Sequence, residues 1–164
     1  MWLAKIEQEN SAFHPAVMIY EKLMTLYPAS QDYAAALYQV AMLKQENGVI
    51  VNLASLAGLG GAPGLGAYVA SKHGVVGLTR TAALEYSKRG IRVNAVCPSF
   101  TNTDMVRRMI DKDPKLEQIL NNASPMKRMG EPREVASAVA YLCSDEASFT
   151  NGQALALDGG ITAW

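Results

Sequence analysis

Three side chains in the middle of the chain have the types and spacing that proton transfer needs. Tyr68 and Lys72 stand four residues apart, so on a helix the phenol and the ammonium lie on one face, one turn apart. A phenol is a poor acid or base at neutral pH, but a neighbouring ammonium favours its phenolate form. Ser55 lies thirteen residues before Tyr68, and its hydroxyl could hold a substrate oxygen beside the phenol. Alone, the Tyr68–Lys72 spacing is more typical of an ordinary helix with a core tyrosine and a solvated lysine.

Short apolar runs predict the strands that must carry these residues. Residues 49–53, 91–96 and 154–157 are apolar on both faces, which favours parallel strands covered by helices above and below. Helices are predicted at 67–88, where Gly90 follows, and at 132–143, with further helices at 15–27 and 31–45. The alternation of strand and helix predicts an α/β fold with a partial doubly wound parallel sheet.

Several ordered motifs together resemble a known family. Residues 49–55, 68–72, 91–98 and 158–160 closely resemble the second half of a short-chain dehydrogenase/reductase, and the resemblance runs from about residue 41 to the C-terminus. It implies a Rossmann-like sheet with helices on both faces. It also divides the chain into residues 1–30, a helical segment of unknown role, and residues 31–164, the C-terminal part of such a domain.

The resemblance implies a role for each candidate residue. Tyr68 would be the general acid/base, Lys72 would favour its phenolate and touch the cofactor ribose, and Ser55 would position the substrate oxygen, which makes these three the catalytic residues. Tyr68, Lys72, Pro98 and Thr103 would bind the cofactor, NAD or NADP. The implied reaction interconverts a small-molecule alcohol and a ketone. Ser99 replaces the family's usual glycine, which could alter the fit of the nicotinamide.

Two segments would surround the substrate. The glycine-rich loop at 56–66 occupies the position that lines the family's substrate pocket; the alternative is a flexible connector. Residues 103–123 would form a mobile lid over the substrate; the alternative is an ordinary pair of surface helices.

The front of the chain departs from the family. No G-x-x-x-G-x-G loop follows an apolar strand before Ser55, and no asparagine stands near residues 27–30, where the fourth catalytic residue would fall. We therefore expect impaired cofactor binding and an apolar strand edge at 49–53 that is open to pairing. Two hypotheses follow: an oxidoreductase, or a truncated, catalytically silent remnant that acts as an assembly or regulatory partner.

Composition and charge limit the other functions. The 164 residues contain fifteen Lys+Arg and fifteen Asp+Glu, so net charge gives no case for nucleic acid or an anionic membrane. A cytoplasmic protein is the default expectation. Cys97 and Cys143 are expected as two buried free thiols rather than a disulfide or metal pair, and two histidines are too few for a metal site. A stripe of small residues along the helix at 67–88 would suit a homo-oligomer, as in the family, or close packing within one chain; the stripe is Ala70, Gly74, Gly77 and Thr81.

Overall fold

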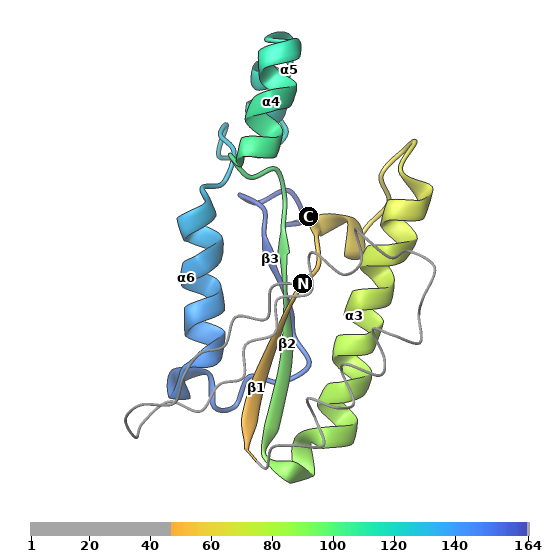
Figure 1. The fold of residues 1–164 in the computed structure, drawn as a ribbon, viewed down its shortest axis with the longest axis vertical. Helices are drawn as coiled ribbons and strands as arrows, with labels where there is room; N and C mark the ends of the chain where they lie inside the picture. The colour runs from red at the N-terminus through yellow and green to blue at the C-terminus, as the bar shows by residue number, and fades with distance from the viewer. Residues whose placement is uncertain (1–46, 164) are drawn as a thin grey trace.

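Three parallel strands form the centre of the computed structural model, which describes residues 47–163. The strands are β1 (Gly48–Leu53), β2 (Ile91–Pro98) and β3 (Ala154–Leu157), in the order β1-β2-β3. Helix α3 (Gly66–Tyr86) covers one face of the sheet and α6 (Pro132–Cys143) the other, while α4 (Asp104–Lys112) and α5 (Lys115–Asn122) stand together beyond one end (Figure 1). The predicted fold class, a partial doubly wound parallel sheet, is confirmed.

The strands are apolar on both faces because both faces are covered. Alternate residues of β2 point to opposite sides: Ala95 and Cys97 pack with Val75 and Val76 of α3, whereas Val96 packs with Leu142 of α6. On β1, Ile50 joins the α3 side and the two valines flanking it join the α6 side. Burial on two sides therefore explains why the strands carry apolar residues on both faces. The parallel pairing of β1 with β2 places their carboxyl ends next to each other.

Two polar side chains of the strands, the buried Asn52 and the half-buried Arg92, fix the helices to the sheet. Asn52 of β1 donates through Nδ2 to Thr79 Oγ1 of α3 at 2.9 Å, in a site where the Thr79 side chain has no solvent exposure. On the other face, Arg92 of β2 donates to the carbonyl oxygens of Leu142 (2.8 Å) and Ser144 (3.0 Å), at the C-terminal end of α6. These bonds hold α3 and α6 in fixed positions relative to the strands.

Observed boundaries agree with the sequence patterns to within a few residues. Helix α6 and strand β3 have the predicted limits. The predicted helix at 67–88 is α3 followed by a short 3₁₀ turn, Ser87–Arg89, which ends at Gly90 with a φ of 73°. Strand β2 continues two residues beyond the prediction, to Pro98. The helices expected at 15–27 and 31–45, and the division at residue 30, lie outside the described residues.

Candidate functional site

Tyr68 and Lys72 share one face of the first turns of α3, as their spacing predicts. Lys72 Nζ lies 5.6 Å from the centroid of the Tyr68 ring and donates to the carbonyl oxygen of Leu53 at 3.4 Å. The Tyr68 side chain is about half exposed, at 45%. The lysine amine is thus held between the phenol and the carboxyl end of β1, where it can act on both the phenol and a ligand.

Ser55 follows β1 and begins a short 3₁₀ turn, Leu56–Gly58, that packs against α3. Its Oγ accepts a hydrogen bond from the backbone N–H of Ala57 at 3.2 Å. At Gly58, a Cβ atom would stand 2.7 Å from the carbonyl oxygen of Lys72, so the turn approaches the helix backbone more closely than any side chain permits. This contact places the Ser55 turn against the turn of α3 that carries Lys72. Within residues 47–163, no hydrogen bond joins Ser55 to Tyr68 directly.

Gly58 is a site residue that could not be told apart from the other glycines of its loop by sequence alone. The loop at 56–66 contains five glycines, and of these Gly60, Gly61, Gly64 and Gly66 would meet no atom within 4 Å if given a Cβ. The position of Gly58, three residues after Ser55, was a possible signal, but its need for close approach depends on α3, which is distant in sequence.

Cys97 lies beside this site without taking part in it. Its side chain is fully buried in β2, and burial raises the pKa of the thiol, although a backbone hydrogen bond from Ser55 and the positive charges of Arg80 and Lys72 oppose the rise. Cys143 is half-buried, and both cysteines are free, as expected. A raised pKa keeps Cys97 as a neutral thiol at neutral pH, so it acts as a packing residue.

Pro98 and Thr103 lie where the chain leaves β2. Pro98 is the last residue of the strand, and Thr103 caps α4, its Oγ accepting from the backbone N–H of Val106 at 3.4 Å. A hydroxyl that accepts can also donate, so Thr103 keeps a hydrogen for a ligand, and the Lys72 ammonium keeps two after its bond to the Leu53 carbonyl. These donors fit the amide and ribose of the nicotinamide cofactor that the resemblance implies.

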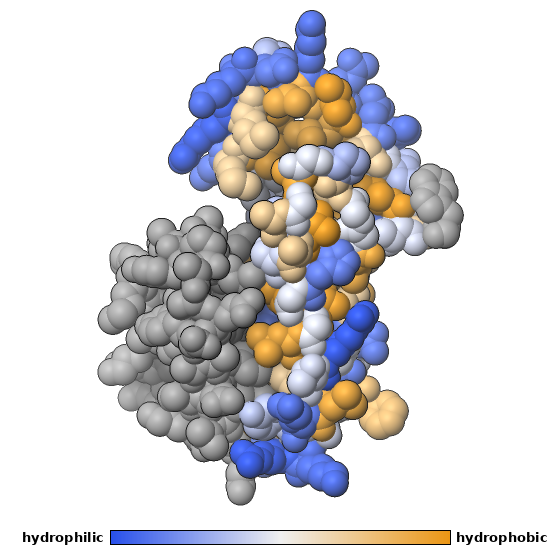
Figure 2. Space-filling view, turned by 90° about the vertical axis from the view of Figure 1, so that its right-hand side faces the viewer, coloured by the Kyte–Doolittle hydropathy of each residue, from blue (hydrophilic) through white to orange (hydrophobic). Residues whose placement is uncertain are grey.

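The segment expected as a lid, residues 103–123, contains a pair of short amphipathic helices, α4 and α5, with Pro114 between them, which we call the lid helices. Their exposed apolar side chains include Met105, Met109 and Ile119, and Phe100 and Met126 are exposed on the connecting segments. Figure 2 shows apolar atoms gathered in a hollow over these helices, flanked by hydrophilic ones. The hollow is seen from the side of the molecule that carries α3, the helix of Tyr68.

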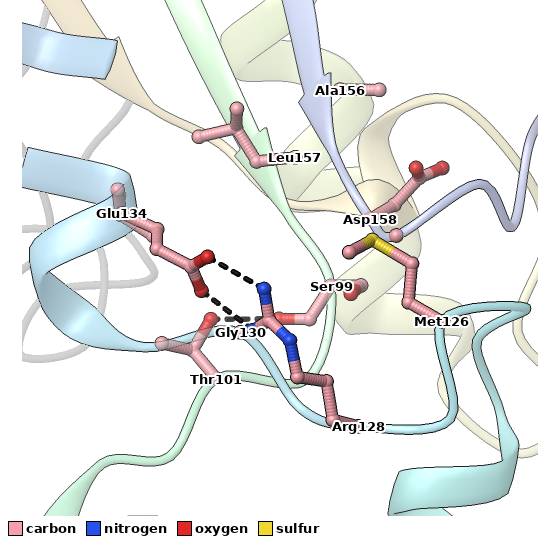
Figure 3. Close-up of a pocket in the computed structure, with 11 residues that line it drawn as sticks. Ser99, Thr101, Met126, Arg128, Gly130, Glu134, Ala156, Leu157 and Asp158 are labelled. Atoms are coloured by element: carbon pink, nitrogen blue, oxygen red, sulfur yellow. Dashed lines mark hydrogen bonds and ion pairs between the residues drawn. The ribbon is translucent and has the colours of Figure 1, made fainter. Parts of the chain in front are cut away.

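A pocket of about 280 Å³ lies on the other side of the strand ends, between β3 and the start of α6 (Figure 3). Across it Arg128 forms a two-pronged ion pair with Glu134, with N–O distances of 2.8 and 2.7 Å. The Arg128 hydrogen bonds, together with one from the backbone N–H of Glu131, lower the pKa of Glu134 to about 2. Local sequence pattern gives no signal for this pair, because its members stand six positions apart across a turn.

Residues 47–163 contain neither a cluster of metal-ligating side chains nor a helix that could span a membrane. No group of three or more His, Cys, Asp or Glu side chains in that part of the chain is placed to hold a metal ion. Among its helices, none combines the length and apolarity needed to cross a bilayer.

Comparison with known proteins identifies the family. Residues 30–162 match the family model described as enoyl-(acyl carrier protein) reductase. The chain is 52% identical over 128 residues to 2,5-dichloro-2,5-cyclohexadiene-1,4-diol dehydrogenase of Sphingobium indicum, covering 77% of this chain and 51% of that protein. It is therefore similar to about half of that relative's length.

Solved structures give the same result. Aldohexose dehydrogenase of Thermoplasma acidophilum, in ligand-free form, superposes with a TM-score of 0.71 at 38% identity, over 80% of this chain and 55% of that one. NAD⁺-bound xylitol dehydrogenase gives a TM-score of 0.67 at 36% identity, over 73% and 51%. Strand order, motifs and relatives agree: the chain belongs to the short-chain dehydrogenase/reductase family.

Proposed function

We propose that the chain provides the catalytic half of an NAD- or NADP-dependent oxidoreductase that interconverts an alcohol and a ketone. The observation that carries the proposal is the grouping at the carboxyl edge of the sheet. There the Lys72 amine stands 5.6 Å from the centroid of the Tyr68 ring and bonds the end of β1, while the Ser55 turn packs on the same turn of α3. Sites at this edge are the general rule in parallel α/β sheets.

Each residue has one task in the proposed reaction. The Tyr68 hydroxyl gives a proton to a ketone oxygen, or its phenolate takes one from an alcohol. The Lys72 ammonium favours the phenolate, and the Ser55 hydroxyl donates to the substrate oxygen and orients it. Pro98 and Thr103 would lie against the nicotinamide and its amide, and the cofactor, when bound, supplies or accepts the hydride.

The lid helices favour a small substrate with an apolar body. Met105, Met109 and Ile119 are 70%, 51% and 61% exposed, and methionine side chains adapt readily to irregular apolar shapes. A related dehydrogenase is named for a chlorinated cyclohexadiene diol, which is a small uncharged ring compound. We infer an uncharged alcohol or ketone for this chain.

The outer face of α3 supports a homo-oligomer. Among residues 47–163, no atom lies within 4 Å of where a Cβ of Gly74 or Gly77 would be, and Leu84 on the same helix is 80% exposed. Glycine inside a helix costs about 1 kcal/mol relative to alanine, and close approach of a second helix would offset that cost. A second copy of α3 is the partner we propose.

Calorimetric titration of the 164-residue chain with NADH and with NADPH tests the cofactor proposal. We expect binding tighter than about 1 mM, weakened about tenfold by Lys72→Met and unchanged by Lys88→Met, which removes an exposed lysine at the far end of the helix. Absence of binding to either cofactor would instead support the silent assembly partner.

Tyr68→Phe tests the chemistry separately. The variant should keep its circular dichroism spectrum but lose turnover by about 10²-fold or more, because the proton donor is gone. Turnover at the unmodified rate would remove Tyr68 from the mechanism.

A further inference from the structure

The two segments that connect the lid helices to the sheet are joined to each other at their base. Residues 99–102 lead out from β2 to α4, and residues 124–130 return from α5 to α6. The backbone N–H of Asn102 donates to the carbonyl of Gly130 at 2.8 Å, and the N–H of Gly130 donates to the carbonyl of Phe100 at 2.9 Å. The lid helices therefore stand on two connecting segments, the outgoing leg (99–102) and the return leg (124–130). These two legs pair with each other like short parallel strands.

The return leg is held from the side of α6. Arg128 on this leg forms its two-pronged pair with Glu134 in the first turn of α6, and the same carboxylate accepts from the backbone N–H of Glu131 at 2.7 Å. Glu131 in turn accepts from the side-chain amide of Asn102 on the outgoing leg at 3.1 Å. The start of α6 thus contacts both legs, and Figure 3 shows its ion pair with the return leg.

The return leg is also held from the side of β3. The backbone N–H of Met126 donates to the carbonyl of Gly159 at 3.3 Å. Gly159 has a φ of 60°, and a Cβ there would stand 3.0 Å from Oγ of the buried Ser124, which itself donates to the carbonyl of Arg128 at 3.0 Å. The glycine turn after β3 therefore fits closely against the leg.

Asp158 holds that turn in shape. Its carboxylate accepts from the backbone N–H groups of Gly160 and Thr162, both at 2.9 Å, and from the Thr162 hydroxyl at 2.7 Å. Burial raises the pKa of Asp158, but these hydrogen bonds outweigh it and leave the pKa below its ordinary value. The turn is fixed by its own side chain and presents a rigid surface to the return leg.

We infer that Arg128 and Glu134 are positioning residues, which fix the return leg and so set where the lid helices and Thr103 stand above the carboxyl end of β2. Thr103 follows Asn102 directly, so displacement of the paired legs displaces the cap of α4. The inference rests on the proposed function in so far as Thr103 and the lid serve cofactor and substrate. The structural part of the inference, that a remote ion pair controls the position of the lid helices, does not depend on the proposed function.

Hydrogen–deuterium exchange of the full 164-residue chain, without cofactor, tests this control. We compare Arg128→Gln, Glu134→Gln and the double variant with Glu85→Gln, which removes an exposed carboxylate from α3. Backbone amides at 104–122 should exchange about threefold faster in each single variant, while those of β2 and the Glu85 control stay unchanged. The double variant should show no further increase, because either change removes the whole pair.

Three outcomes would overturn the inference. These are unchanged exchange at 104–122, an increase of the same size in β2, which marks a general loss of stability, and additive effects in the double variant. Because no cofactor is present, failure of the NADH titration leaves this result standing, and failure here leaves the proposed catalytic group standing.

Discussion

Gly58→Ala is the substitution whose effect the structure defines most sharply. The new methyl group would lie 2.7 Å from the carbonyl oxygen of Lys72, 3.0 Å from its carbonyl carbon and 3.1 Å from Cγ2 of Val76. Two of these three atoms belong to the helix backbone, which cannot rotate away. Relief to an ordinary contact of 3.4 Å needs a displacement of about 0.7 Å between the Ser55 turn and α3.

Such overpacking costs about 1–3 kcal/mol. In a chain of this length, it should lower the melting temperature by about 5 °C. Because the displaced turn carries Ser55, turnover in an active preparation should also fall, by up to about 10²-fold.

A second glycine of the same loop is the matched control. Gly61→Ala meets no atom within 4 Å, and both substitutions reduce the freedom of the unfolded chain equally. The difference between the two variants in urea unfolding therefore isolates the contact with α3. Equal unfolding free energies for the two variants would refute the close approach.

Two further predictions concern charge and assembly. The pKa of Glu134, lowered to about 2, means that its contribution to stability is complete above about pH 4.5 and is lost as the pH falls towards 2. Urea unfolding at pH 5 and pH 3 should show a smaller loss in Glu134→Gln than in the unmodified chain, and equal losses would contradict the pairing with Arg128. Gly77→Arg should reduce the mass of the assembly measured by sedimentation, because it places a long charged side chain on the proposed interface. A monomeric unmodified chain would argue against a second copy there.

The strands and main helices could be predicted because the local pattern of apolar and polar residues reflects which faces are buried. Both faces of β2 are covered, so apolar residues stand on both of them, and α6 begins at Pro132, where proline suits a first turn. Tyr68 and Lys72 could be paired in advance because a helix repeats every 3.6 residues. The end of α3 was placed two residues late, since its last residues tighten into a 3₁₀ turn before Gly90.

Contacts between distant segments could not be predicted in this way. The approach of Gly58 to Lys72 depends on how a loop lies against a helix, and that position is set by the whole sheet. The Arg128–Glu134 pair crosses a turn whose course is fixed by the legs of the lid. Their partners become visible only when the chain is folded, so local periodicity contains no signal for them.

The hydrogen bond from the Lys72 amine to the Leu53 carbonyl affects how such a protein can evolve by point mutation. A carbonyl oxygen is present whatever amino acid stands at that position, so the amine has an anchor that point mutation does not erase. The lid residues have no comparable tie to the amine. Under the proposed function, substitutions in α4 and α5 would therefore change substrate selectivity while Tyr68 and Lys72 keep their positions, so that one scaffold could acquire new substrates with the same proton transfer.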